Sequence, residues 1–311
     1  MKPVLACTDI DNIASMLHKD FHLVSPRVYY DHRLKLNADA LLIFDTCNVP
    51  EDILKLLDCP VIGSGRHTKV AQTATLDKVG IRHPKTLHVS IGWSGYRCDN
   101  VYSYLKYFKF PVVLKIGGGA RGLGQIKMDS PDALYGTLEY FNEYSNTLND
   151  EASPQDFLRK FDVEGAYVGN QDFNEHEAGV IIESINSGNW FIQELLQDIV
   201  EYRVVTLYGN EPMVVSRKPA ETGWQCNVSA GGYGEYVPSV QGDLKNAVEA
   251  VDAIRDRLNS PWLSADVYMN STGEWGVFEY QMQMGYKSMP KIELATRVSS
   301  SVSKMLANHG R

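Results

Sequence analysis

A lysine followed by a glycine-rich segment is the first group of residues that could do chemistry in this sequence. In residues 110–116, apolar positions alternate with Val113 and Lys115, which predicts a strand whose second face carries Lys115. The glycines and the arginine that follow are Gly117, Gly118, Gly119, Arg121, Gly122 and Gly124. Glycine allows positive φ angles and lets backbone N–H groups approach an anion. Lys115 and this flap therefore predict a site for nucleotide phosphates, with an ordinary glycine-rich hairpin as the alternative.

A predicted hairpin near residue 270 gathers side chains with oxygen atoms. If Thr272-Gly273 is a two-residue loop, Asp266 lies opposite Glu279, and Gln281 shares their face. The opposite face then carries Ala265, Val267, Met269, Phe278 and Tyr280 toward the core. Two neighbouring carboxylates repel each other unless a cation lies between them, and oxygen ligands suit Mg²⁺. We therefore expect a metal site at Asp266, Glu279 and Gln281, with neutralisation by a Lys or Arg as the alternative.

An earlier predicted hairpin places two arginines together. With Gly209–Glu211 as a three-residue loop, Arg203 falls opposite Arg217. Two adjacent guanidinium groups need an anion, and Arg binds carboxylate or phosphate through two parallel hydrogen bonds. The alternative is that each arginine reaches a separate acid. Asn227, before another glycine pair, is a candidate for the floor of the same pocket. Together these parts favour ATP-dependent chemistry on an acidic substrate.

The elements that would position these residues form an α/β pattern. Over roughly 1–65, strands alternate with helices at 11–20 and 50–58, which predicts a small parallel α/β domain. Further helices are expected at 68–80, from Ser130-Pro131 onward, at 242–259 and at 290–307. Residues 142–182 are acidic and lack strong apolar periodicity, so we interpret them as an insertion or excursion from the core.

Composition limits the possible classes of protein. A chain of 311 residues predicts about two domains, and no run approaches the about 18 apolar residues of a membrane span. The first residues contain no apolar secretory signal, and five scattered cysteines indicate reduced thiols. A net charge of −8 argues against a general nucleic-acid binder. We expect a cytoplasmic protein without membrane or nucleic-acid partners.

From about Gly63 to the C-terminus, interrupted at 142–182, the chain resembles the ATP-grasp superfamily. It is most similar to the RimK-like branch of glutamate and amino-acid ligases. Lys69 and Lys115 match the two phosphate-binding lysines of the family, and Gly117–Gly124 match its flap. The remaining matches are Gln193, Glu194 and Leu196 (adenine-binding hinge), Glu201 (ribose-binding acid), Arg203, Arg217 and Asn227 (substrate and phosphate side), and Asp266 and Glu279 (magnesium carboxylates).

The chain departs from the family pattern at three places. Thr68 stands where the family usually has Asp before the first lysine. Gln281 stands where the third metal ligand is usually Asn, and its amide oxygen reaches one methylene further. The segment MQMGYKSMP lacks the usual Pro-Gly turn.

The resemblance implies an α/β (α+β) ATP-grasp fold with three parts. These are an N-terminal α/β domain and linker (1–90), a smaller lobe with the flap and the acidic insertion (91–190), and a larger lobe with the metal and substrate site (191–311). It implies an ADP-forming ligase that joins a carboxylate to an amine through an acyl phosphate. ATP, one or two Mg²⁺ ions (or Mn²⁺), an amino-acid or peptide substrate and a homo-oligomer are further implications. A kinase with this fold and a non-catalytic ATP-binding protein are the alternatives.

Overall fold

The structure of the chain is a computed structural model. It describes residues 4–7, 17, 20–24, 39–42, 59, 61–62, 69–88, 105–116, 123–146, 153–169, 173–221, 224–226, 231–258, 260–281 and 289–309. The strands are β1 (Val4–Cys7), β2 (His22–Val24), β3 (Ala40–Leu42), β4 (Val61–Ile62), β5 (Thr86–His88), β6 (Val112–Ile116), β7 (Gln125–Met128), β8 (Ala166–Val168), β9 (Trp190–Glu194), β10 (Ile199–Leu207), β11 (Asn210–Lys218), β12 (Tyr233–Val237), β13 (Trp262–Asn270) and β14 (Trp275–Gln281). The helices are α4 (Lys69–Lys78), α6 (Pro131–Asn146), α7 (Pro154–Arg159), α8 (Glu175–Asn186), α9 (Gly242–Arg257) and α10 (Lys291–His309).

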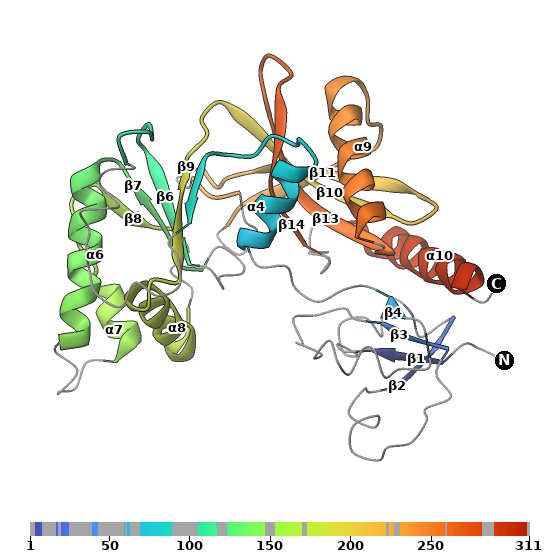
Figure 1. Cartoon of the computed structure of the whole chain (residues 1–311), viewed down its shortest axis with the longest axis horizontal. Helices are drawn as coiled ribbons and strands as arrows, with labels where there is room; N and C mark the ends of the chain where they lie inside the picture. The colour runs from blue at the N-terminus through green and yellow to red at the C-terminus, as the bar shows by residue number, and fades with distance from the viewer. Residues whose placement is uncertain are drawn as a thin grey trace.

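The described strands form three sheets, which Figure 1 shows as separate groups. The N-terminal sheet has the order β2-β1-β3-β4, and its neighbouring strands are parallel. This confirms the parallel arrangement expected near the N-terminus. The helices expected at 11–20 and 50–58 fall outside the described residues, apart from Leu17 and Asp20.

The second sheet, here called the β6 sheet, has the order β5-β9-β6-β7-β8 and is antiparallel. Helices α6, α7 and α8 lie together on one side of it (Figure 1). Val112, Leu114 and Ile116 are buried against these helices, together with Phe141 of α6. Lys115 lies on the other face, among the residues of a pocket. The alternation expected for residues 110–116 is therefore confirmed.

The interpretation of residues 142–182 as an excursion from the core is wrong for the described part of the segment. It forms the end of α6, α7, β8 and most of α8, and Leu158, Ala166 and Ile181 are buried in the core of the β6 sheet. Ser153 caps α7, and Asn174 forms a reciprocal capping box with Glu177 at the start of α8. Helix α7 and strand β8 each bury one residue, Leu158 and Ala166. The acidic, solvent-facing residues of this segment therefore hide its apolar periodicity in the sequence.

The third sheet, here called the β10 sheet, has the order β12-β11-β10-β13-β14 and is antiparallel. It is covered on both faces. Val204 packs with α9 and with Leu76 of α4, whereas its neighbour Val205 packs with α10 and with residues near the N-terminal sheet. Because successive side chains of a strand point to opposite faces, β10 supplies two separate cores.

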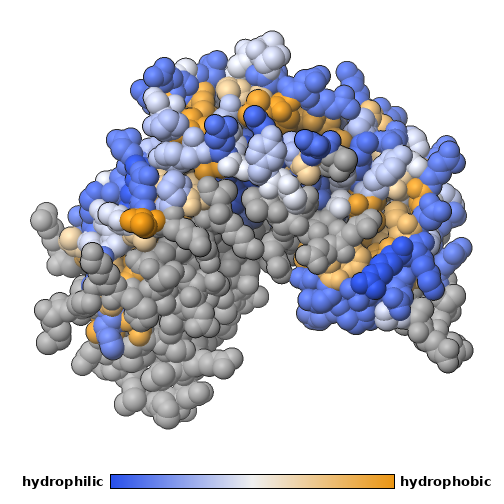
Figure 2. All heavy atoms as spheres, turned by 180° about the vertical axis from the view of Figure 1, so that it is seen from behind, coloured by the Kyte–Doolittle hydropathy of each residue, from blue (hydrophilic) through white to orange (hydrophobic). Residues whose placement is uncertain are grey.

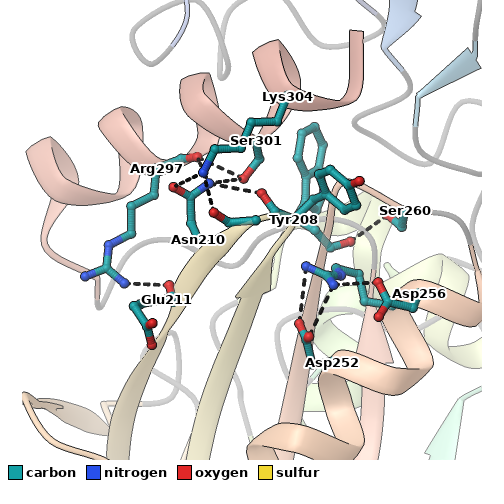
Figure 3. Close-up of polar contacts among 12 residues, drawn as sticks. Tyr208, Asn210, Glu211, Asp252, Asp256, Ser260, Arg297, Ser301 and Lys304 are labelled. Atoms are coloured by element: carbon teal, nitrogen blue, oxygen red, sulfur yellow. Dashed lines mark hydrogen bonds and ion pairs between the residues drawn. The ribbon is translucent and has the colours of Figure 1, made fainter. Parts of the chain in front are cut away.

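Helix α10 is joined by polar contacts to the turn between β10 and β11, as Figure 3 shows. Asn210 Nδ2 donates to the carbonyl of Arg297 at 3.2 Å and to Ser301 Oγ at 2.8 Å. Lys304 donates to the carbonyl of Gly209. On another side of α10, Ser299 Oγ donates to Asp20 Oδ2 at 2.5 Å. Helix α10 therefore links the β10 sheet to the N-terminal part of the chain.

Residues 81–88, here called the strap, contact both antiparallel sheets. The N–H of Val277 in β14 donates to the carbonyl of Arg82 at 2.9 Å. The N–H of Glu194 in β9 donates to the carbonyl of Lys85 at 3.0 Å. Residues 86–88 then continue as β5, which pairs with β9. The strap therefore ties the edge of the β10 sheet to the β6 sheet.

Hydrophilic residues dominate the visible outer rim around α6–α8, which lies on the right in Figure 2. The exposed acids of this region include Asp156 and Glu175. Among the described helices, none combines the length and the apolar character that a membrane crossing would need.

A pair of substitutions in α8 tests whether this helix belongs to the core. Ile182 is 4% exposed and Val180 is 39% exposed. Ile182→Ala should lower the free energy of unfolding by about 2–5 kcal/mol because it leaves a cavity. Val180→Ala should change it by no more than about 0.5 kcal/mol. Urea unfolding measures both, and two equally small effects would show that α8 does not contribute to the core.

Candidate active site

A pocket of about 250 Å³ lies between the β6 sheet and the β10 sheet. Residues that were singled out from the sequence and line it are Lys69, Lys115, Gln193, Glu194, Leu196, Glu201, Asp266 and Glu279. They come from α4, β6, β9, β10, β13 and β14 and the segment after β9. The structure thus brings together residues that are up to 210 positions apart in sequence, from Lys69 to Glu279.

Lys115 is held in the pocket by β9. Its Nζ donates to Gln193 Oε1 at 2.6 Å and lies 5.8 Å from the centroid of the Phe278 ring. Gln193 is itself fixed, because its Nε2 donates to Thr86 Oγ1 at 3.1 Å. Burial lowers the pKa of Lys115 to about 8, although Glu201 and Asp266 act to raise it. An anion in the pocket would favour the protonated form of this lysine.

Residues at the end of β9 and just after it supply both polar and apolar side chains to one edge of the pocket. The N–H groups of Glu194 and Leu195 already donate to the carbonyls of Lys85 and Pro111. These contacts fix the backbone just before Leu196, which the sequence analysis expected in the adenine-binding hinge. Gln193, Glu194 and Leu196 therefore lie together in the pocket.

The floor of the pocket is a network of buried charges. Arg203 binds both carboxylate oxygens of Asp266, with Nη2 2.9 Å from Oδ2. Arg217 Nη1 lies 2.6 Å from Glu201 Oε1 and 3.1 Å from Asp266 Oδ1. Burial raises the pKa of Asp266, but Arg203 and Arg217 outweigh it and lower the pKa below its usual value. Burial, followed by the charge of Asp266, raises the pKa of Glu201 to about 7 against the opposing effect of Arg217.

The expected register of the first hairpin is wrong. Arg217 lies opposite Glu201, and Arg203 lies opposite Val215. The turn consists of Tyr208-Gly209, with Leu207 paired to Asn210, and the register also shifts between Val205 and Leu207. The two arginines still share a face, and acids of the chain neutralise them. These acids are not separate, as the alternative expected, because both arginines contact Asp266. Neither side chain is among the residues that line the pocket.

The pairing of Asp266 with Glu279 is confirmed, but it arises differently from the expected hairpin. The N–H of Asn270 donates to the carbonyl of Glu274, so the loop is the three residues 271–273 and is one residue longer than expected. The register then shifts between Asp266 and Val267, which leaves Phe278 as the extra residue of a β-bulge. Phe278 was expected in the core, and this expectation is wrong. The bulge turns Phe278 into the pocket, and Val277 occupies the core instead.

Lys69 and Gln281 both contact Glu279. Lys69 Nζ forms an ion pair with Glu279 Oε2, and Gln281 Nε2 donates to Glu279 Oε1 at 2.9 Å. Lys69 is positioned by α4, of which it is the first residue. In this structure Lys69 therefore neutralises the acid pair at Glu279. This agrees with the alternative expected from the sequence, in which a Lys or Arg takes the place of a metal.

The acid pair nevertheless fits a hard divalent cation. In the described residues no three His, Cys, Asp or Glu side chains converge as metal ligands, so the donors here would be two carboxylates and one amide. A carboxylate has about four lone-pair positions. Lys69 and Gln281 occupy two of those of Glu279, and a half-turn of the Gln281 amide would present its oxygen. Oxygen donors of this kind suit Mg²⁺ or Mn²⁺.

Phe278 and Cys226 are among the pocket residues that were not singled out as part of the site from the sequence. Phe278 reaches the pocket only through the bulge, for which the sequence has no clear signal. Cys226 lines the pocket beside Glu201, and burial together with Glu201 raises its pKa to about 12. A thiol with this pKa is not a reactive nucleophile. Gly118, Gly119, Arg121, Gly122 and Asn227 lie outside the described residues.

Comparison with known proteins places this geometry in a known fold. No protein-family model matches the chain. The structure is similar to the D-alanine–D-alanine ligase of Bacillus anthracis complexed with ATP, with a TM-score of 0.61 at 14% identity over 98% of this chain and 95% of that chain. It is also similar to a RiPP-associated ATP-grasp ligase of Chryseobacterium gregarium in complex with ADP and a leader and core peptide. That comparison has a TM-score of 0.57 at 11% identity over 99% of this chain and 97% of that chain. The chain has the ATP-grasp fold.

Another solved structure and one protein sequence are also similar to this chain. N5-carboxyaminoimidazole synthetase of Staphylococcus aureus, complexed with ADP, gives a TM-score of 0.59 at 13% identity over 94% of this chain and 74% of that chain. By sequence, 187 residues are 26% identical to the α-aminoadipate–LysW ligase LysX of Saccharolobus solfataricus. This match covers 57% of the chain and 63% of the length of LysX.

Removal of one partner tests the buried charge network of this ATP-grasp pocket. Arg217 has a side chain that is 5% exposed and bridges two carboxylates. Arg217→Met should lower the free energy of unfolding by about 3–5 kcal/mol, because it leaves buried charge uncompensated. Adding Glu201→Gln to that variant should recover part of the loss, since Arg203 still neutralises Asp266. Urea unfolding at pH 7.5 measures both, and additive losses would contradict the network.

Proposed function

We propose that this chain is an ATP- and Mg²⁺-dependent ligase that joins a carboxylate to an amine through an acyl phosphate. The observation that carries the proposal is the meeting of Lys69, Lys115, Asp266 and Glu279 in one pocket beside the end of β9. Two of these groups suit phosphate oxygens and two suit a divalent cation. The names of LysX and of the similar structures, which include ligases with bound ATP or ADP, support the same class of reaction.

In this proposal ATP occupies the pocket with its adenine at the end of β9. Gln193, Glu194 and Leu196 bind the base, and the ring of Phe278 provides an apolar surface near it. Glu201 accepts hydrogen bonds from the ribose. Lys69 and Lys115 bind the phosphates, together with the flap residues Gly118, Gly119, Arg121 and Gly122.

Asp266, Glu279 and Gln281 would hold one or two Mg²⁺ ions, or Mn²⁺ in their place. The metal would neutralise negative charge on the phosphates during transfer. Arg203 and Arg217 keep Asp266 ionised and oriented, and their positive charge remains close to the reacting groups. Asn227 is assigned to the substrate side.

The proposed reaction requires no nucleophilic side chain. An oxygen of the substrate carboxylate attacks the γ-phosphorus of ATP, the bond to the β–γ bridging oxygen breaks, and ADP leaves. An amine then attacks the acyl carbon, phosphate leaves, and the amine loses a proton as the amide forms. Positive charge and positioning carry most of the rate enhancement in such a transfer. We place the substrates among amino acids and peptides.

We also propose three parts of the chain: an N-terminal domain with its linker (1–90), a smaller lobe (91–190) and a larger lobe (191–311).

One observation favours a second candidate, a non-catalytic ATP-binding protein. Both acids of the candidate metal site already contact cations of the chain: Asp266 contacts Arg203 and Arg217, and Glu279 contacts Lys69. If these contacts persist when nucleotide binds and keep the metal out, the site lacks the cation that phosphoryl transfer needs. The protein would then bind ATP without turnover.

ADP release with ATP, Mg²⁺ and a panel of amino acids and short peptides separates the two candidates. Parallel reactions contain hydroxylamine, which traps an acyl phosphate as a hydroxamate. A hydroxamate that depends on a particular carboxylate identifies the ligase and the acid half of its substrate. ATP binding without ADP or hydroxamate across the panel identifies the non-catalytic protein.

Matched substitutions test the proposed roles of the pocket residues. Lys115→Ala and Glu279→Ala should abolish ADP formation and leave the far-ultraviolet circular dichroism spectrum unchanged. Lys127→Ala and Glu274→Ala are the controls. Lys127 pairs with Asp129 and is not among the residues that line the pocket, and Glu274 is an exposed residue of the same hairpin as Glu279. Both controls should retain activity. Turnover like that of the unchanged protein in either pocket variant would remove the proposed site.

The lowered pKa of Lys115 predicts how ATP binding depends on pH. With a pKa of about 8, Lys115 loses its proton as pH rises from 7 to 9 in the free protein. ATP affinity should therefore fall above pH 8, by at most about tenfold per pH unit. Lys115→Arg should flatten this dependence, since arginine stays protonated. Titration calorimetry at several pH values measures both proteins, and identical pH profiles would exclude the role of Lys115.

A further inference from the structure

Strand β14, which carries Glu279 and Gln281, lies at the edge of the β10 sheet. The outward N–H groups of an edge strand need partners other than a neighbouring strand. Two such groups in β14 have partners from distant parts of the chain. The N–H of Val277 donates to the carbonyl of Arg82 in the strap at 2.9 Å, and the N–H of Tyr280 donates to Gln72 Oε1 at 3.2 Å.

The two contacts lie on either side of the β-bulge. Val277 precedes the extra residue Phe278, and Tyr280 lies between the two candidate metal ligands Glu279 and Gln281. The bulge determines that Glu279 faces Asp266 and that Phe278 enters the pocket. A strand with only one of its edges paired in the sheet can relax a bulge more easily than a central strand, so these outer contacts matter.

Gln72 is well placed to fix the strand. It is only 5% exposed, although its side chain is polar, and Leu76 one turn later is 2% exposed in the core beneath the sheet. Lys69, which pairs with Glu279, is three residues earlier in α4 and therefore on the same side of the helix. One face of α4 thus contacts both the side chain of Glu279 and the backbone of the next residue.

We propose that Gln72 is a positioning residue for the metal ligands. Its amide oxygen holds the backbone of Tyr280, so that Glu279 and Gln281 are presented toward Asp266. This inference rests on the metal site of the proposed function. It adds to that proposal a residue whose side chain touches neither the nucleotide nor the metal.

Substitution of Gln72 tests the proposal through metal binding. Gln72→Met keeps the length of the side chain and removes the acceptor, whereas Gln72→Glu keeps an acceptor oxygen. Mn²⁺ binding is measured by electron paramagnetic resonance with a non-hydrolysable ATP analogue present. Gln72→Met should weaken Mn²⁺ binding by about ten- to a hundredfold, the usual effect of losing a contact that orients a metal ligand. Gln72→Glu should bind Mn²⁺ as tightly as the unchanged protein or more tightly.

Leu76→Ala is the control for loss of stability. It removes packing between α4 and the same sheet and should destabilise the fold by about 2–5 kcal/mol. It leaves the contact with Tyr280 in place, so Mn²⁺ binding should remain unchanged. Weakening of equal size in Leu76→Ala and Gln72→Met would show that general stability, not positioning, is responsible.

Kinetics supply a second test where the protein turns over. In Gln72→Met, the Mg²⁺ concentration for half-maximal ADP release should rise about tenfold or more, while kcat at saturating Mg²⁺ stays near its original value. Normal Mn²⁺ binding in Gln72→Met would overturn this inference alone. Absence of Mn²⁺ binding in the unchanged protein would overturn the metal site and, with it, this inference.

Discussion

The guanidinium group of Arg217, shared between Glu201 and Asp266, is the interaction on which the pocket depends. Asp266 is buried and Glu201 is partly buried, and a buried charge without a partner is too costly to retain. The network of charges extends beyond Arg217. Asp266 also binds Arg203 and lies opposite Glu279, and Glu279 pairs with Lys69. Strands β10, β11, β13 and β14 and helix α4 therefore have to be assembled together. Buried ion pairs of this kind add little stability, but they disfavour other arrangements of the same strands.

The apolar packing of the two antiparallel sheets holds these charges at fixed places. In the β10 sheet, one face is covered by α9 and α4 and the other by α10. In the β6 sheet, the described helices pack against the face of Leu114, and Lys115 lies on the opposite face, which lines the pocket. The strap crosses from one sheet to the other at Arg82 and Lys85. The position of Lys115 relative to Glu279 is thus set by several cores and not by local sequence.

Local patterns were sufficient for some of these features. Alternation placed Lys115 correctly, because a strand with one packed face must show a period of two. A short loop leaves two consecutive strands few ways to pair except with each other. The pairing of β10 with β11 and of β13 with β14 could therefore be predicted. The register of Arg217 was wrong because a two-residue turn and an irregularity replaced the expected loop. The pairing of Asp266 with Glu279 was right only because a longer loop and a bulge compensate. The contact of Gln72 with Tyr280 spans 208 residues and leaves no trace in either local pattern.

Helix α10 also affects the order in which the chain can fold during synthesis. Phe21 and Ile62 share one core with Val298 and Val302, so these early residues are packed against residues that are synthesised well over 200 positions later. At a synthesis rate of roughly 5–20 residues per second, residues 298–302 are made on the order of ten to fifty seconds after the N-terminal sheet. During this interval its apolar side chains are exposed to other nascent chains and to chaperones. This core is therefore completed only after residues 294–305 have been made, long after Phe21 and Ile62 have left the ribosome.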